Sequence, residues 1–391
     1  MKRFFLIVLA LALAATLVLC TAACSGDKSN DSEKETEFTP ATKEDAFVGE
    51  TGTFEYALNS EGKCEITKYT PKSVAVVDVK LPATTDDGRD IIGISADAFK
   101  AENSIKSVTI PASYTYVDDY AFYDCDALET VTFEGENITV IGTGAFEGCD
   151  KLRAINLPKS VVDVEPFAFK DCSSLLSVDL SGAAKSINEG AFYECSALKT
   201  VTLSDAIDYV CKNAFYGCDA LEYTTYENAL YLGNSANPYL VLVSAENLNI
   251  ESCTVNDATK VIASQAFFAC EYLTSLTLGD NVKVISARSF EGCSEIEYNE
   301  SENGFYLGTD SNPYMVLMGL VVPSVEDFTL NTETKILCDT ALDNCAALAD
   351  IHFAGTAEAW EAIIKTDTWH NGRTVRIVFA DETIEPIIYN N

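Results

Sequence analysis

The feature that most constrains the fold is a short motif that returns along most of the chain. Residues 121–133 read "AFYDCDALETVTF", residues 145–157 read "AFEGCDKLRAINL" and residues 191–203 read "AFYECSALKTVTL". Each of these three copies places Ala-Phe first, then Cys three residues after the Phe, then a Leu and a β-rich run. A fixed period in the low twenties indicates a solenoid, because one such unit cannot bury its apolar face alone and must stack on its neighbours.

The Phe anchors of the motif give the period directly. They are Phe99, Phe122, Phe146, Phe169, Phe192, Phe215 and Phe267, with weaker copies at Phe290 and Leu342. Successive anchors lie 23 or 24 residues apart, except for two steps of 52 residues. Each long step therefore holds one normal unit and an insert.

The two inserts contain matching segments, "NALYLGNSANPYLVLV" at 228–243 and "NGFYLGTDSNPYMVLM" at 303–318. Each segment predicts a β-hairpin, because two β-rich runs flank a turn of Gly, Asn, Ser and Pro. Two interpretations are open. The hairpin projects as a ligand-binding arm, or it is built into the stack and extends the sheet of its unit.

The chemistry within one unit predicts its local structure. In "LETVTF" (128–133), alternation points Val131 and Phe133 inward and Thr130 and Thr132 outward, as in a short strand. The AFxxC segment is expected to form a short helical turn that directs Phe and Cys into the core. Strands from successive units would then form a parallel sheet along one concave side of the solenoid.

These repeats resemble the BspA-like leucine-rich repeats, whose pattern is roughly LxxVxIPxxVxxIGxxAFxxC. The segment "LKTVTLSDAIDYVCKNAFYGC" at 198–218 is similar to that pattern, and the resemblance covers about residues 50–391. It implies a β-rich leucine-rich-repeat solenoid, a right-handed coil with short helical turns. It also implies a surface or secreted protein of the kind implicated in adhesion.

The N-terminus is typical of a bacterial lipoprotein signal. Lys2 and Arg3 precede an apolar run over 4–19, and small residues precede Cys24. We expect a signal peptide over 1–23, lipid attachment at Cys24 and a disordered tether over 24–47, since this polar stretch has too few apolar residues to order itself. Thr21 departs from the Leu usual in such signals, and an ordinary secretory signal or an uncleaved anchor helix are the alternatives.

The remaining boundaries follow from where the period starts and stops. We expect an N-terminal β-hairpin cap over 48–90, the solenoid over 91–353 with hairpin inserts near 226–252 and 301–327, and a C-terminal helix and strand cap over 354–391. Thr356 is a candidate N-cap of the terminal helix. A solenoid needs such atypical ends because its core would otherwise meet water.

Charge and motif content exclude several function classes. The net charge of −34 repels phosphate backbones, so no nucleic-acid partner is expected, and membrane contact is expected only through the N-terminal lipid. The chain has two histidines and lacks the sequence motifs of common hydrolases and phosphate-binding loops. We therefore predict no enzymatic activity, no cofactor and no metal site.

The cysteines follow the repeat instead of forming a disulfide framework. Eight of the 14 occupy one repeat position: Cys125, Cys149, Cys172, Cys195, Cys218, Cys270, Cys293 and Cys345. We expect them to stack in the core as reduced thiols, which behave there as small hydrophobic groups. The absence of CxxC pairs also disfavours a zinc site.

The outward strand positions form the candidate ligand face. They are Ser107, Thr109, Thr130, Thr132, Asn156, Ser177, Asp179, Thr200, Thr202, Tyr223, Thr225, Ser275 and Thr277. Extended surfaces of this kind are what solenoids use for binding. The sequence predicts a lipid-anchored protein on the outer face of the bacterial cell membrane that binds an extracellular protein or glycan. Protein binding in adhesion is the first hypothesis, and a carbohydrate-binding module and a passive spacer are the alternatives.

Overall fold

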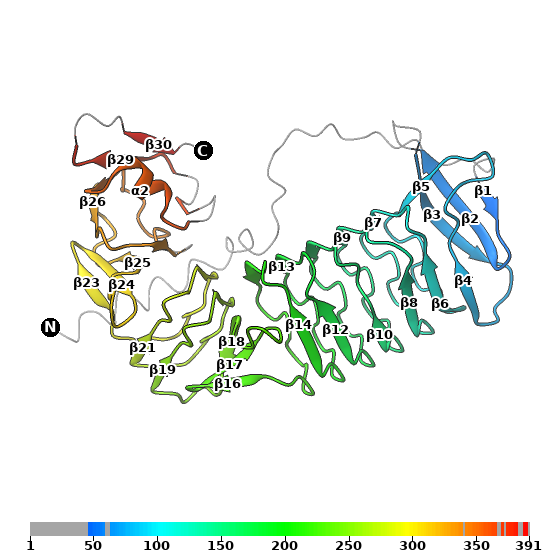
Figure 1. Cartoon of the computed structure of the whole chain (residues 1–391), viewed down its shortest axis with the longest axis horizontal. Coiled ribbons are helices and arrows are strands. Elements are labelled where there is room, and N and C mark those ends of the chain that lie inside the picture. The colour runs from blue at the N-terminus through cyan, green and yellow to red at the C-terminus, as the bar shows by residue number, and fades with distance from the viewer. Residues whose placement is uncertain are drawn as a thin grey trace.

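The computed structural model describes residues 46–58, 63–338, 341–365, 369–370, 373–381 and 386–389. The described chain forms an elongated arch of stacked β-turns and strands, with β1–β3 at one end and β29, β30 and α2 at the other (Figure 1). The predicted signal peptide, Cys24 and the tether up to residue 45 lie outside the described residues. Ala46 and Phe47, which we had assigned to the tether, belong to strand β1.

Two ladders of short strands run along the first half of the arch. The nine-stranded ladder contains β1 (Ala46–Val48), β2 (Gly52–Leu58), β3 (Cys64–Pro71), β5 (Ile91–Ile94), β7 (Tyr116–Val117), β9 (Val140–Ile141), β11 (Asp163–Val164), β13 (Ser186–Ile187) and β15 (Tyr209–Val210). The six-stranded ladder contains β4 (Val77–Lys80), β6 (Ile105–Ile110), β8 (Thr130–Phe133), β10 (Ala154–Ile155), β12 (Ser177–Leu180) and β14 (Thr200–Leu203). From β3 onward the pairing is parallel, and equivalent repeat positions lie opposite each other, as with Thr130 and Ala154. The predicted β-solenoid is confirmed.

A third ladder joins the AFxxC turns. From Phe99 to Phe192, each anchor Phe N–H donates to the carbonyl of the Ala in the next unit, as from Phe122 to Ala145 at 2.8 Å and from Phe169 to Ala191 at 2.8 Å. The turns are not helical, so the expectation of short helical turns is wrong. Tyr120 and Asp124 have φ values of 56° and 54°, and this left-handed backbone at every fourth residue interrupts an α-helix.

The core is a column of stacked aromatic rings. It starts with Phe54, Tyr69 and Phe99 and continues through the Phe anchors to Phe215. Phe146 and Phe169 have ring centroids 5.4 Å apart and planes inclined by 6°. A second, shorter column pairs Phe267 with Phe290. Val131 is buried and Thr130 and Thr132 are exposed, as alternation predicted.

The cysteines line the same core. All twelve that the structure describes are free and buried. Six of the eight cysteines at the shared repeat position also have a polar role, because each thiol donates to the carbonyl oxygen of a Phe in the preceding unit, as Cys172 does to Phe146 at 3.1 Å and Cys195 to Phe169 at 3.0 Å. Burial raises the pKa of both thiols above the usual value for cysteine.

Both inserts are built into the stack. The first contains β16 (Thr224–Tyr226), β17 (Ala229–Leu232) and β18 (Val241–Ala245), and the second contains β23 (Asn299–Ser301), β24 (Gly304–Leu307) and β25 (Val316–Leu320). Each has the predicted hairpin, β17 with β18 and β24 with β25, plus one further antiparallel strand. The last strand of each pairs in parallel with the next unit, β20 (Val261–Ile262) or β27 (Ile336–Leu337). The built-in interpretation is therefore the one that the strand pairing supports. Between the inserts lie β19 (Ser252–Thr254), β21 (Ser275–Thr277) and β22 (Val284–Ile285).

The two ends differ from the repeats. At the first end β2 and β3 form an antiparallel hairpin, but β3 also pairs in parallel with β5, so part of the expected cap is already a layer of the solenoid. At the other end β26 (Asp327–Leu330), β28 (Asp350–Phe353) and β29 (Val375–Phe379) are parallel, and β30 (Ile387–Tyr389) is antiparallel to β29. Thr356 accepts from Ala359 N at 3.2 Å and caps the N-terminus of α2 (Ala357–Glu361), and Trp360 is buried. Within the described residues, no helix has the length and apolar character needed to cross a membrane.

The aromatic column predicts the effect of removing one ring. Phe169→Ala should lower the free energy of unfolding by roughly 3–5 kcal/mol, because it deletes a fully buried ring between two stacked neighbours. Leu176→Ala is the control, since Leu176 is 54% exposed and should cost much less. Urea denaturation of residues 25–391 measures both changes. Equal stability of the Phe169→Ala variant and the parent would contradict the inward placement of the ring.

The thiol ladder predicts chemical inertness. In folded residues 25–391, fewer than one cysteine per chain should react with a disulfide reagent within minutes at pH 8, because burial both blocks access and disfavours the reactive thiolate. In denaturant, all twelve thiols of the same chain should react with the reagent. Rapid reaction of several thiols in the folded chain would contradict the burial.

Candidate functional site

The outward face of the six-stranded ladder, which we call the strand face, brings most of the predicted ligand residues together. Parallel pairing places one row across the strands through Ser107, Thr130, Ala154, Ser177 and Thr200. A second row pairs Thr109 with Thr132 and Asp179 with Thr202. The rows form because each strand repeats its neighbour at the same register. Most of their side chains present short hydroxyl groups, but Ala154 on β10 has none and Asp179 carries a carboxylate.

The predicted residues differ in exposure and in sheet. Exposed ones are Thr130, Thr132, Asn156, Ser177, Asp179, Thr200, Thr225 and Ser275, and half-buried ones are Ser107, Thr109, Thr202, Tyr223 and Thr277. Asn156 follows β10, Thr225 lies in β16, and Ser275 and Thr277 lie in the separate β19–β21 pair. The structure therefore groups the predicted residues up to Thr202 on one sheet and places the later ones on other sheets.

Tyr223 does not have the outward position that its repeat register predicted. It is half-buried and packs against the first core cluster. Burial raises its pKa above the usual value for tyrosine. The cause is the insert, since β16 pairs antiparallel with β17 and does not continue the parallel ladder. The strand face therefore loses the one aromatic residue that the sequence assigned to it.

Charged residues that sequence reasoning missed border the strand face. Ser107 Oγ donates to Asp78 Oδ1 at 2.6 Å, and Lys80 Nζ lies 2.7 Å from Glu134 Oε1. Asp179 accepts from Ser181 N at 2.9 Å, and its hydrogen bonding with Ser181 lowers the pKa of its carboxyl group. The face is thus hydroxyl-rich on either side of β10 and carries paired or ionised groups nearby.

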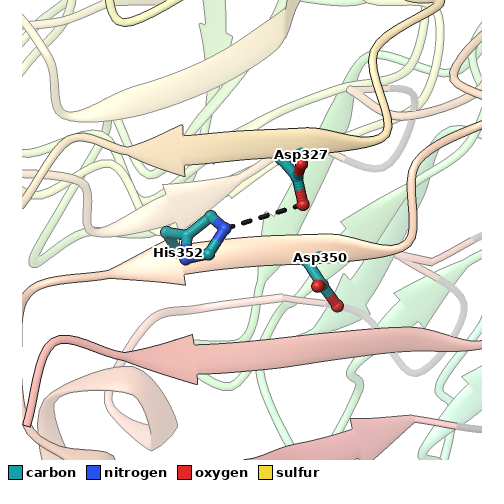
Figure 2. Close-up of side chains that lie close together, drawn as sticks. All are labelled: Asp327, Asp350 and His352. Atoms are coloured by element: carbon teal, nitrogen blue, oxygen red, sulfur yellow. Dashed lines mark ion pairs between the residues drawn. The ribbon is translucent and has the colours of Figure 1, made fainter. Parts of the chain in front are cut away.

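A second polar group lies near the C-terminal end, on β26 and β28. Figure 2 shows His352 directed toward Asp327, with 3.6 Å between His352 Nε2 and Asp327 Oδ1. Asp350 lies opposite Asp327 in the parallel pairing, one repeat period further along the chain. The three side chains hold potential ligand atoms within 4.8 Å of one another. The spacing of 23 residues between the two aspartates was the signal that could have predicted this group.

The chemistry of this group is limited by a neighbouring arginine. Arg376 Nε donates to Asp350 Oδ1 at 2.7 Å, and hydrogen bonding with Arg376 lowers the pKa of Asp350. A metal ion would have to compete with that guanidinium group, so we assign no metal site here. His352 has acids beside it, but no described Ser or Cys is hydrogen-bonded to its ring, and Thr329 lies opposite on β26. The absence of enzymatic activity stays a prediction.

The Arg376–Asp350 pair predicts a pH-dependent contribution to stability. Because the pair lowers the folded-state pKa of Asp350, its stabilisation is present above the usual aspartate pKa of about 3.9 and is lost as the pH falls through the folded value. Asp350→Asn should therefore lower the melting temperature at pH 6 and lower it less near pH 3. Arg376→Met should show the same trend. A constant difference across this pH range would contradict the assignment.

Comparisons with known proteins agree with this architecture. The family model for the BspA type leucine rich repeat region matches this chain in six copies, over residues 92–236 and 244–310. A leucine-rich cell surface protein from Faecalibacterium prausnitzii is similar in structure with a TM-score of 0.43 and 24% identity, over 81% of this chain and 97% of that one. A leucine-rich repeat protein from Bacteroides ovatus has a TM-score of 0.39 and 19% identity, over 86% of this chain and 100% of that one.

A leucine-rich repeat protein from T. pallidum is similar with a TM-score of 0.35 and 21% identity, over 66% of this chain and 91% of that one. No curated protein sequence matches the chain. The family model covers more than half of the 391 residues, and its repeats coincide with the stacked units described above. The chain therefore belongs to the BspA-type leucine-rich-repeat family.

Proposed function

We propose that this protein is a lipid-anchored surface protein that binds an extracellular protein through its strand face and acts in adhesion. The observation that carries the proposal is the pair of outward rows. One row presents Thr130, Ser177 and Thr200 in one register on β8, β12 and β14, with Ala154 of β10 between the first two. A regular polar surface of this kind suits an extended partner, which can form hydrogen bonds to successive strands.

The placement of the aromatic side chains favours a protein over a glycan on this face. Sugar rings stack on aromatic rings, and Tyr223 is half-buried against the first core cluster and does not belong to the strand face. The short hydroxyl groups of the rows can donate and accept hydrogen bonds and therefore suit a polypeptide backbone. Carbohydrate binding is the second candidate, and a passive spacer is the third.

The location is part of the same proposal. The apolar run at 4–19 and the small residues before Cys24 support export and lipid attachment at that cysteine. The polar stretch that follows supports a tether that holds the solenoid away from the membrane. The net charge of −34 would keep the folded part away from anionic lipid and favour a partner with basic groups.

An array experiment tests the strand face. Residues 25–391, purified under reducing conditions, should bind at least one protein on an array of mucins, matrix proteins and glycans. Thr130→Glu combined with Thr200→Glu should weaken that binding at least tenfold, because both side chains are exposed in the same row. The matched control is Ser196→Glu with Ser294→Glu, which adds the same charges at exposed positions outside the strand face.

Three outcomes would change the proposal. Equal binding by the strand-face variant and the parent would place the site elsewhere on the molecule. Binding to glycans only would replace the protein partner with a carbohydrate. No binding by the parent would favour the spacer.

A further inference from the structure

The ladder of hydrogen bonds between turns stops at one place in the first half of the arch. Each turn normally donates three N–H groups to the next, as Gly190 does to Lys212 O, Phe192 to Ala214 O and Glu194 to Tyr216 O. The equivalent donors of the following turn are the N–H groups of Asn213, Phe215 and Gly217. In the described chain none of these three has a backbone acceptor.

The first insert explains why the ladder stops. The layer after Phe215 is formed by β18, which has no AFxxC turn. Its Ala245 N donates to Ala266 O at 2.7 Å, which is the bond that a Phe N–H makes in a normal unit. Ala245 therefore occupies the repeat position of a Phe but brings no ring. The stack ends with the Phe192–Phe215 pair, 5.6 Å between centroids, and a new one starts at Phe267.

A cleft of about 530 Å³ lies where the missing turn would be. The turns over 213–216 and 263–265 form its two sides, and Val243 and Ser244 of β18 also line it. One edge is closed by the bond from Ser264 N to Val210 O at 2.9 Å. Its size is in the range of ordinary ligand pockets.

The walls of the cleft are aromatic. Phe215 and Tyr223 line it, as do Tyr216 and Phe268, which are 57% and 47% exposed. Exposed rings on both sides of a cleft are unusual for a surface that meets only water, since each leaves apolar area unburied. The cleft therefore offers the aromatic contacts that the strand face lacks.

The opposite side of the cleft has backbone carbonyl groups that accept no backbone hydrogen bond. In a normal unit the carbonyls three residues before and one residue after the Phe accept from the preceding turn, as Lys212 O and Tyr216 O do. Their equivalents across the cleft are Ser264 O and Phe268 O. Within the described residues no backbone N–H donates to either of them. The cleft thus has backbone donors on one side and backbone acceptors on the other.

We propose that this cleft, which we call the turn slot, binds a peptide segment of another protein that takes the place of the missing turn. The segment's carbonyls accept from the N–H groups of Asn213 and Phe215, which line the cleft, and its N–H groups donate to Ser264 O and Phe268 O. An aromatic side chain of the segment packs against Phe215 and continues the column. Completing an open ladder of main-chain bonds is a known mode of peptide recognition.

The spacing of the open groups favours a peptide over a glycan. The three donors recur at every second residue, and along the rest of the stack a polypeptide backbone satisfies this spacing. A sugar can stack on Tyr216 or Phe268 but does not supply alternating donors and acceptors at that spacing. The net charge of −34 favours basic residues flanking the aromatic one.

The second insert provides an internal comparison. There Met318, Gly319 and Leu320 stand where the first insert has Val243, Ser244 and Ala245. Met318 packs against the second core cluster and Leu320 is buried, so two of the three positions carry larger side chains there, while Gly319 is smaller than Ser244. Val243→Met is therefore a substitution that the stack already accepts at the matching position, and it should narrow the slot.

The test uses a phage-displayed library of random 12-residue peptides panned against residues 25–391. We expect enriched peptides that share an aromatic residue. Their affinity, measured by calorimetry with synthetic copies, should fall at least tenfold with Ser244→Trp, which fills the slot, and fall with Val243→Met. The double variant Tyr216→Ala with Phe268→Ala should lower the affinity of the peptides by a similar factor, because it removes the two exposed aromatic rings that line the slot.

Two control variants should bind the peptides as the parent does. Tyr272→Ala removes an aromatic side chain that is 60% exposed and lies outside the slot. Thr130→Glu with Thr200→Glu alters the strand face only, so failure of the proposed function leaves this result unchanged. If Ser244→Trp does not fold, as judged by circular dichroism, the binding of the peptides to the Tyr216→Ala with Phe268→Ala variant tests the proposal instead.

Three results would overturn the turn slot. Panning would enrich no peptide over a parallel selection on the Ser244→Trp protein. Alternatively, the enriched peptides would bind the parent and the slot variants equally. The third is a glycan that binds the parent and not the Ser244→Trp variant, which would assign the slot to carbohydrate.

Discussion

The structure depends on the match between one turn and the next. A single AFxxC turn leaves a Phe ring, a thiol and three backbone N–H groups without partners until another turn stacks on it. Stacking then satisfies all of them together: Phe146 lies on Phe169, Cys172 donates to Phe146 O, and Phe146 N donates to Ala168 O. Because each unit satisfies its neighbour and not itself, the chain needs many units in one register.

That register also creates both candidate binding surfaces. Where it is kept, equivalent side chains lie side by side and produce the hydroxyl rows of the strand face. Where the first insert interrupts it, Ala245 replaces a ring and the turn slot opens beside Phe215. The same constraint therefore produces a flat polar surface and a concave aromatic one, which suit different parts of a partner.

The repeat period and the residue types predicted the fold, the inward positions of Phe and Cys, and a hairpin in each insert. They did not decide whether the hairpins project from the stack or are built into it. The helical-turn prediction was wrong because left-handed backbone at Tyr120 and Asp124 interrupts the turn, and neither the period nor the residue types had indicated that backbone. The outward position predicted for Tyr223 was wrong, because the repeat register does not reveal which strand will pair with the next one. Here β16 pairs antiparallel with β17 and does not extend the parallel ladder. The turn slot was missed because it consists of partners that are absent, and only the neighbouring layers reveal which bonds should have been there.

Amide hydrogen exchange of residues 25–391 tests whether turn-to-turn hydrogen bonds hold the stack and stop at Phe215. We expect slow exchange at Gly190, Phe192 and Glu194, whose N–H groups donate to the next turn, and much faster exchange at Asn213, Phe215 and Gly217. Equal protection at both sets would contradict this expectation, because the ladder would then continue through the first insert.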